Sequence, residues 1–271
     1  MPELPEVEVV RRGLEPLLSG RRVQSVHCAV PALRYPLPDL GVLVGHTCQH
    51  ITRRAKYLQF EFDHDFLLAW HLGMTGQFHV LTSNAPKAKH EHVRIDFTDG
   101  SSLRYRDTRR FGYAGLMSVS DWQSHAWFRE LGPEPLLDVF DGEYLYERCR
   151  NRKAPIKHVL MNAKAVVGVG NIYASEALFR AGIHPACKAG RVSRKRMHIL
   201  VQHVKEILCE AIDAGGSTIS DFVQVDGKPG YFAFGFQVYG RKGEACPRCG
   251  HVIRRKVQAG RSTFYCPGCQ H

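Results

Sequence analysis

The first three residues, Met1-Pro2-Glu3, could carry out chemistry on an aldehyde-like carbon. Removal of the initiator Met would leave Pro2 with a free secondary amine, whose pKa lies well below that of an ordinary Lys. Attack by this amine gives an iminium ion, which carries a fixed positive charge and withdraws electrons. Glu3 stands beside the amine, where its carboxyl group could transfer protons. The alternative is a stiff, frayed chain terminus.

Four cysteines near the other end of the chain have the spacing of a structural zinc site, C-x₂-C-x₁₆-C-x₂-C. Each C-x₂-C pair can bring two thiolates to one tetrahedral ion. A closed shell of four thiolates leaves no position for water, so this metal would fold the segment and take no part in catalysis. A redox dithiol pair is the alternative. The predicted ligands are Cys246, Cys249, Cys266 and Cys269.

The charge of the chain favours an anionic polymer as partner. Lys and Arg total 37 against 26 Asp and Glu, which gives a formal net charge of +11. A lysine-rich surface would be the ordinary explanation, but here Arg clusters are interleaved with aromatic residues, which suits a phosphate backbone better. These clusters lie at residues 53–56, 104–110, 148–157, 191–196 and 254–256.

A wedge for a base stack could be formed by Met74, Arg109 and Phe111, which offer a flexible apolar chain, a guanidinium and an aromatic ring. Residues of the type of Met74 and Phe111 are, however, more often core residues. His90 could bind a phosphate, whereas a metal site that it shares with His92 is only weakly indicated.

Two other positions could contact phosphates. The glycine-rich turn at residues 167–170 leads into Asn171 and a predicted helix, whose free N–H groups could face an anion, although tight helix packing would explain the glycines as well. Arg261 lies at the tip of a predicted hairpin with strands at 252–257 and 262–265, and is equally typical of an exposed surface residue.

Hydrophobic periodicity indicates how these residues are positioned. A helix is predicted over residues 5–18. Short strands follow at 26–30, 58–62, 67–71, 77–81, 93–97, 102–106 and 113–119, several of them with alternating apolar residues such as Leu58, Phe60 and Phe62, so the first 130 residues read as a helix and an antiparallel β-sandwich or barrel. Prolines at 133 and 135 mark a domain boundary. Beyond it the pattern is helical. The predicted helices cover residues 141–151, 155–162, 171–181 and a long amphipathic stretch from Ser193 to the glycines at 215 and 216.

Other classes of protein are disfavoured. The acidic start lacks the apolar segment of a secretory signal, and no apolar run approaches the length of a membrane span. The remaining cysteines are predicted to be buried thiols of a reducing compartment. They are Cys28, Cys48, Cys149, Cys187 and Cys209.

Taken together, these residues resemble the bacterial formamidopyrimidine-DNA glycosylases over the whole chain. The resemblance rests on seven motifs that occur in order. They are PELPEVE at 2–8, RAKY at 54–57, HLGM at 71–74, RRFG at 109–112, VGVGNIYASE at 167–176, DGKPGY at 226–231 and the four-cysteine finger.

The resemblance implies an α+β, multidomain fold. A catalytic domain over residues 1–131 would combine an N-terminal helix with a β-sandwich, a helix–two-turns–helix domain would cover 132–238, and a zinc finger with one structural zinc ion would cover 239–271. It also implies a monomer in the bacterial cytoplasm, with no membrane contact, that acts on damaged double-stranded DNA.

The resemblance further implies excision of oxidised purines, such as 8-oxoguanine and formamidopyrimidines, followed by cleavage of the strand. Pro2 would form a Schiff base with C1′ of the damaged nucleotide, and Glu3 would donate a proton during base release. The remaining implied roles are proton transfer in β-elimination for Lys56, δ-elimination and phosphate clamping for Arg261, void filling for Met74, Arg109 and Phe111, and DNA backbone contacts for His90, Lys153 and Asn171.

Three alternatives remain open. An endonuclease VIII-type enzyme for oxidised pyrimidines would share Pro2, Glu3 and the finger. A non-catalytic zinc-ribbon DNA-binding protein would account for the charge but not for Pro2-Glu3, and a thiol-redox protein is disfavoured by the cysteine spacing. The aromatic residues at 232–236 leave the base preference less certain than the catalysis.

Overall fold

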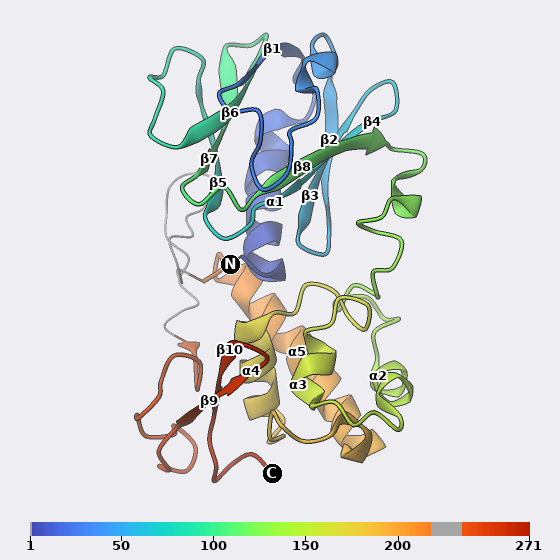
Figure 1. Cartoon of the computed structure of the whole chain (residues 1–271), viewed down its shortest axis with the longest axis vertical. Coiled ribbons are helices and arrows are strands. Elements are labelled where there is room, and N and C mark those ends of the chain that lie inside the picture. The colour runs from blue at the N-terminus through green and yellow to red at the C-terminus, as the bar shows by residue number, and fades with distance from the viewer. Residues whose placement is uncertain (1, 218–234) are drawn as a thin grey trace. The chain divides into compact units, whose positions relative to one another are not determined.

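The computed structural model describes residues 2–217 and 235–271, which belong to two compact units (Figure 1). Among the described residues, the N-terminal unit comprises residues 2–129 and 214–217, and the C-terminal unit comprises residues 130–213 and 235–271. The DGKPGY motif at 226–231 and most of the aromatic segment at 232–236 lie outside the described residues.

The N-terminal unit contains one long helix and two four-stranded antiparallel sheets, as predicted. One sheet has the order β1-β6-β7-β5 and the other the order β2-β3-β4-β8. Strand β2 was not predicted, because only two residues of this edge strand, Cys48 and Ile51, are buried. The elements are α1 (Leu4–Leu18), β1 (Val23–Cys28), η1 (Leu40–Leu43), β2 (Cys48–Arg54), β3 (Tyr57–Phe62), β4 (Phe66–His71), β5 (Gly76–Thr82), β6 (Glu91–Phe97), β7 (Ser101–Asp107), β8 (Tyr113–Ser118) and η2 (Trp122–Ser124).

Helix α1 is fixed by the core of this unit. Its residues Val7, Leu14 and Leu18 are almost fully buried, and the helix packs against strands of both sheets, namely β2, β3 and β5. Each fully buried aliphatic side chain contributes about 1.5–3 kcal/mol relative to an exposed one. The apolar stripe therefore holds the first turn of α1 in a defined position.

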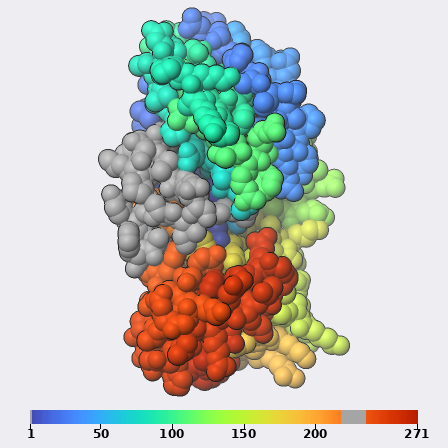
Figure 2. Space-filling view, turned by 60° about the vertical axis from the view of Figure 1, so that its left-hand side comes forward, coloured from blue at the N-terminus to red at the C-terminus, as the bar shows by residue number. Residues whose placement is uncertain are grey.

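The C-terminal unit is helical and ends in a two-stranded hairpin, again as predicted. Helix α5 packs against α2 and α4, and α4 packs against β10. The orange-red to red surface in Figure 2 belongs to residues 235–271 of this unit. The elements are α2 (Gly142–Cys149), α3 (Ile156–Leu160), α4 (Asn171–Arg180), η3 (Ala189–Arg191), α5 (Arg194–Asp213), β9 (Arg254–Gln258) and β10 (Arg261–Tyr265).

The prediction that all five scattered cysteines are buried was right for only two of them. Cys48 and Cys149 are buried, and burial raises the pKa of the first thiol to about 12 and of the second to about 11. Cys28 in β1 and Cys209 in α5 are exposed, and Cys187 is half-buried. Within the described residues, no helix is long and apolar enough to cross a membrane.

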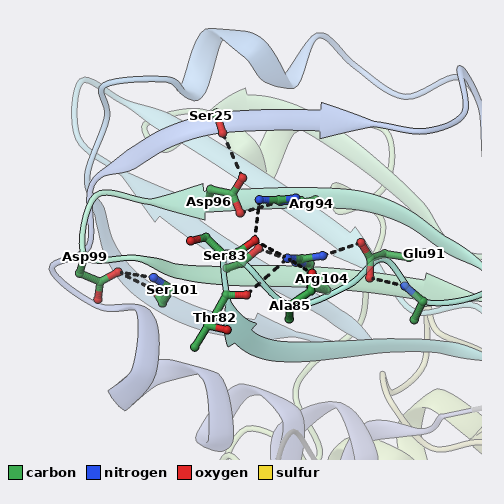
Figure 3. Close-up of polar contacts among 12 residues, drawn as sticks. Ser25, Thr82, Ser83, Ala85, Glu91, Arg94, Asp96, Asp99, Ser101 and Arg104 are labelled. Carbon is green, nitrogen blue, oxygen red and sulfur yellow. Dashed lines mark hydrogen bonds and ion pairs between the residues drawn. The ribbon is translucent and has the colours of Figure 1, made fainter.

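A buried ion pair fastens the segment that precedes His90 to the first sheet (Figure 3). The Arg104 side chain is fully buried and donates to a carboxylate oxygen of Glu91 at 2.9 Å. Its other nitrogens donate to the Ser102 hydroxyl at 2.6 Å and to the carbonyls of Ser83 and Ala85 at 3.1 and 3.3 Å. The guanidinium therefore links β6, β7 and the connection between β5 and β6.

We expect Arg104→Met to destabilise the N-terminal unit by about 3–5 kcal/mol, because the buried Glu91 carboxylate then loses its close partner and keeps only Arg106, at 3.9 Å. Arg94→Met is the matched control. Arg94 also bonds an acid, Asp96, but its side chain is 34% exposed, so we expect a loss of at most about 1 kcal/mol. Urea unfolding followed by tryptophan fluorescence measures both. Equal losses would show that the buried pair contributes no more than the surface pair.

Candidate functional site

The first residues of the chain are fixed in place by Glu6. Pro2 and Glu3 are buried, and Glu3 donates its backbone N–H to one carboxylate oxygen of Glu6 at 2.8 Å. The other oxygen of Glu6 accepts from the N–H and the hydroxyl of Ser217 at 3.0 and 2.9 Å. The Glu6 side chain is itself only 2% exposed. A frayed terminus is therefore excluded for Glu3.

Lys56 lies close in the fold to the start of α1, although it is distant in sequence. It occupies the two-residue turn between β2 and β3, in which Ala55 has a φ of 55°. Arg53 connects this turn to the helix, because it donates to Glu8 at 2.9 Å and to the Ala55 carbonyl at 2.9 Å. Burial alone would raise the pKa of Glu8, but the hydrogen bonds from Arg11 and Arg53 lower it. The Glu8 carboxylate that binds Arg53 is therefore anionic.

A neutral histidine lies beside Lys56. Burial lowers the pKa of His71 to about 4, and the nearby charges of Lys56 and Arg34 contribute to this lowering. Its Nδ1 accepts the N–H of Gly73 at 3.0 Å, and its ring stacks on Tyr113 with centroids 4.8 Å apart. His71 therefore packs beside Lys56 without adding a second positive charge.

This histidine makes stability dependent on pH. The folded pKa of His71, about 4, lies below the ordinary value of 6.5, so the unfolded chain binds the proton first as the pH falls. Stability is therefore lost as the pH drops from 6.5 to 4, by about 3 kcal/mol at most. We expect His71→Asn, which keeps an acceptor for Gly73, to remove this part of the slope in urea titrations. His27→Asn, at an exposed position, should leave the slope as it is; a slope unchanged in His71→Asn would contradict the assignment.

The three predicted wedge residues lie on two touching loops. Gly73 has a φ of 66°, and an added Cβ there would lie 2.3 Å from the backbone carbon of Phe111. This contact brings the loop of Met74 against the loop of Arg109 and Phe111. The Phe111 ring is 40% exposed, and the Arg109 guanidinium lies 4.6 Å from its centroid. Phe111 is thus a surface residue, and the alternative of a core residue is wrong for it.

Asp107 organises these loops, and the sequence analysis missed it. One carboxylate oxygen accepts from the Thr75 hydroxyl at 2.5 Å and from the Arg109 N–H at 3.2 Å. The other accepts from the Gly112 N–H at 2.8 Å. The backbone N–H of Asp107 donates to the carbonyl of His90 at 3.0 Å, so His90 lies beside the same group. In the sequence, only its place at the end of a predicted strand, just before the RRFG motif, could have drawn attention to this acid.

A hollow in the C-terminal unit brings together Asn171 and Arg261. Its lining also includes Lys157, a lysine that is 1% exposed and that the sequence analysis did not single out. Lys157 donates to the Asn171 side-chain oxygen at 2.6 Å and to the Thr263 hydroxyl at 2.8 Å. Two cations and an amide that line one hollow suit an anionic group.

Lys153 is not part of this hollow. It is exposed on the connection between α2 and α3 and does not belong to the residues that line the cavity. Arg261 is exposed as predicted, but it begins β10, where it pairs with Gln258, and Ala259-Gly260 forms the tip of the hairpin. Both remain candidate phosphate contacts on separate parts of the unit.

The four grouped cysteines converge on one point. Sulfur atoms lie 3.8 Å apart for Cys246 and Cys269, 3.4 Å for Cys249 and Cys266, and 3.2 Å for Cys249 and Cys269. A tetrahedron with zinc–sulfur bonds of about 2.3 Å has edges of about 3.8 Å, and a disulfide would require about 2.05 Å. The group fits one zinc ion and no disulfide. Among the described residues, His90 and His92 belong to no such cluster.

Glycine and a buried acid support the finger. A Cβ on Gly268 would lie 2.7 Å from the His251 ring, so a larger residue in the second cysteine turn would have to displace this histidine. Glu176 on α4 is fully buried and accepts the N–H groups of Gln237, Val238 and Tyr239 at 2.7–2.9 Å. Burial raises the pKa of this carboxyl despite these bonds. The finger is therefore anchored to α4 by a buried acid.

Comparison with known proteins accounts for nearly the whole chain. Three family profiles match, described as the formamidopyrimidine-DNA glycosylase N-terminal domain at residues 1–114, the H2TH domain of the same enzymes at 131–223, and a zinc finger found in FPG and IleRS at 243–271. The formamidopyrimidine-DNA glycosylases of Thioalkalivibrio sulfidiphilus and Idiomarina loihiensis are 50% and 48% identical to it, with all of each chain covered.

Solved structures agree with this result. The Lactococcus lactis FPG in complex with a Fapy-dG containing DNA is 38% identical, with a TM-score of 0.92, and the match covers 99% of this chain and 100% of that one. A MutM complex with carbocyclic 8-oxo-G containing DNA is also 38% identical, with a TM-score of 0.92 over all of both chains. With its motifs, its two-unit fold and these relatives in agreement, the chain belongs to the formamidopyrimidine-DNA glycosylase family.

Proposed function

We propose that this protein is a base-excision repair enzyme that removes oxidised purines, including 8-oxoguanine and formamidopyrimidines, from duplex DNA and then cleaves the strand. The observation that carries the proposal is the fixed Pro2-Glu3 segment, held by Glu6 at the start of α1 and linked to the Lys56 turn through Glu8 and Arg53. The relatives solved with Fapy-dG and 8-oxo-G DNA support the choice of purine lesions.

The nitrogen of Pro2, once Met1 is removed, is the proposed nucleophile. It forms a bond to C1′ while the bond from C1′ to the base breaks, and the electron pair leaves with the base. Glu3 is the proposed proton donor for base release and opening of the sugar ring. After the nitrogen has lost its proton, its lone pair forms the iminium ion as the bond from C1′ to the ring oxygen breaks and that oxygen takes the proton from Glu3. The iminium ion acidifies the C2′ proton, which Lys56 is proposed to help remove, so that the 3′ phosphate can leave.

The proposed DNA contacts divide by role. Met74, Arg109 and Phe111 would occupy the gap in the base stack when the damaged nucleotide turns out of the duplex, and the contact between Gly73 and Phe111 holds their loops together. Phosphates would be bound by His90, Lys153, Asn171 and Arg261. Lys157, which donates to Asn171, is added to this set on its position in the hollow. Arg261 is also proposed to promote the second, δ-elimination.

The finger zinc would be held by Cys246, Cys249, Cys266 and Cys269 and would fold the segment that carries Arg261. We further propose the division into a catalytic domain at 1–131, a helix–two-turns–helix domain at 132–238 and the finger at 239–271. A monomer in the bacterial cytoplasm is the proposed state of the protein.

Borohydride trapping on duplex DNA that contains 8-oxoguanine tests the proposal. Reduction of the iminium ion should give a covalent protein–DNA adduct at the N-terminal residue, identifiable by mass spectrometry. A short extension that converts the Pro2 nitrogen to an amide should abolish both the adduct and strand cleavage. If no adduct forms, or if the extended protein still cleaves, the proposal fails. Stronger trapping on an oxidised pyrimidine would instead identify an endonuclease VIII-type enzyme.

A further inference from the structure

A second cluster of potential metal ligands lies in the N-terminal unit, apart from the cysteine finger. Ligand atoms of His46, Asp63 and His64 all lie within 4.8 Å of one another. His46 Nδ1 and Asp63 Oδ1 are 2.6 Å apart, and the rings of His46 and His64 meet edge to face with centroids 5.3 Å apart. Two imidazoles and one carboxylate are a ligand set typical of zinc.

The backbone holds two of these ligands in place. The Thr47 N–H donates to Asp63 Oδ2 at 3.1 Å, which leaves Oδ1 directed at His46. The backbone N–H of His46 donates to the Leu43 carbonyl and its carbonyl accepts from Val23, while the ring of Phe66 packs 4.9 Å from the imidazole. Fixing a carboxylate through its second oxygen is how metal sites orient such a ligand.

The third ligand comes from a tight turn. Residues 63–65 connect β3 to β4, and His64 and Asp65 both have left-handed backbones, with φ values of 55° and 69°. Asp65 is engaged elsewhere, because it accepts from the N–H and the hydroxyl of Ser120 at 2.8 and 3.0 Å. His64 is exposed. Of the two turn residues, His64 is thus the one that can close on an ion held by His46 and Asp63.

Charge and geometry select the kind of ion. In a tetrahedral zinc site neighbouring N and O ligands lie about 3.3–3.5 Å apart. The His46–Asp63 distance of 2.6 Å is that of a shared proton, which the ion would replace, and the ion would draw His64 inward to complete the set. Asp63 accepts the Thr47 N–H through Oδ2 and faces His46 through Oδ1, so an ion at this position would meet a carboxylate oxygen and an imidazole nitrogen. Arg22 donates to the neighbouring Gly45 carbonyl at 2.8 Å and opposes any cation. Binding must therefore come from direct ligation by imidazole, which hard ions such as Mg²⁺ do not favour.

We propose that His46, Asp63 and His64 form a second zinc site, with a fourth position open to solvent. The site lies at the end of β3 opposite the Lys56 turn, because successive turns of an antiparallel sheet alternate between its ends (Figure 1). The six residues of β3 separate the two by about 20 Å. Zinc here would stiffen the β3–β4 turn and leave strand cleavage unaffected, and the proposal does not depend on the proposed function.

Zinc counting on the full chain tests this. Protein with a loaded finger is dialysed at neutral pH against buffered micromolar zinc, and metal and protein are both measured. We expect about two zinc ions per chain in the natural sequence, and at least about tenfold weaker binding of the second ion in His64→Gln and Asp63→Asn. His27→Gln is the matched control, at an exposed histidine outside both clusters, and should keep two.

Hydrogen exchange provides a second measurement. Zinc should slow amide exchange at residues 46–48 and 62–66 in the natural sequence and not in His64→Gln, a substitution at an exposed side chain that leaves the core intact. One zinc per chain in every variant, or a second ion that persists unchanged in both His64→Gln and Asp63→Asn, would overturn the proposal. So would slowed exchange that is equal in the natural sequence and in His64→Gln.

Discussion

Glu3→Gln is expected to lower excision of 8-oxoguanine by about 100- to 10,000-fold, the range attributed to a well-placed general acid. The amide has the shape of the carboxyl group but cannot release a proton to the departing base. The bond from the Glu3 backbone N–H to Glu6 survives the substitution. The Glu3 side chain also accepts the Glu6 N–H in the capping box of α1, and the amide oxygen of Gln can accept it in the same way. Single-turnover assays on duplex DNA with 8-oxoguanine measure the loss.

The same variant should separate the two halves of the reaction. On DNA with a preformed abasic site no base has to leave, so Pro2 can still form the Schiff base, and strand cleavage should fall far less than base excision. Glu15→Gln is the control on the same helix, where the carboxylate accepts the Ile51 N–H at 2.5 Å at the far end of α1. It should retain full excision. Equal losses on the two substrates would remove Glu3 from the proposed role of proton donor.

Sequence patterns predicted the fold wherever burial follows a simple period. The stripe through Val7 and Leu14 predicted α1, and the alternation Leu58, Phe60, Phe62 predicted β3, because each element has one face in a core. The four cysteines predicted their cluster because spacing alone limits a tetrahedral site. Strand β2 was missed since an edge strand with few buried residues has no such period.

The rest of the site depends on contacts between residues far apart in the chain. Nothing in the sequence near Asp107 indicates that its carboxylate joins Thr75 to Gly112, and nothing near Lys157 indicates burial against Thr263 of the finger. Buried polar groups must be paired, but their partners are chosen by the tertiary fold. The family resemblance implied Lys153 as a DNA contact, whereas Lys157, which the fold places with Asn171 and Arg261, could not be identified from the sequence.

Removal of the finger zinc by Cys249→Ser is expected to unfold the finger. The finger has few buried apolar residues of its own, chiefly Ile253, which clusters with Val238 and with Phe179 of α4. A structural zinc ion, by contrast, provides about 10–16 kcal/mol in isolated zinc fingers. The hairpin that unfolds carries Arg261 and three further cations at 254–256. We expect DNA affinity to fall by about 100-fold at moderate salt, and its dependence on log salt to decrease by about 0.9 for each phosphate that the protein no longer neutralises.

Cys209→Ser controls for the loss of a thiol, because Cys209 is an exposed cysteine on α5 outside the cluster. It should keep the finger zinc and full affinity. The pH-dependent stability assigned to His71 should be the same in both variants, since that residue belongs to the N-terminal unit and the finger to the other. A Cys249→Ser protein that loses zinc and yet binds DNA with unchanged affinity and salt dependence would show that the finger holds no phosphate. In that case Arg261 would lose its proposed role, whereas the chemistry assigned to Pro2 and Glu3 would stand.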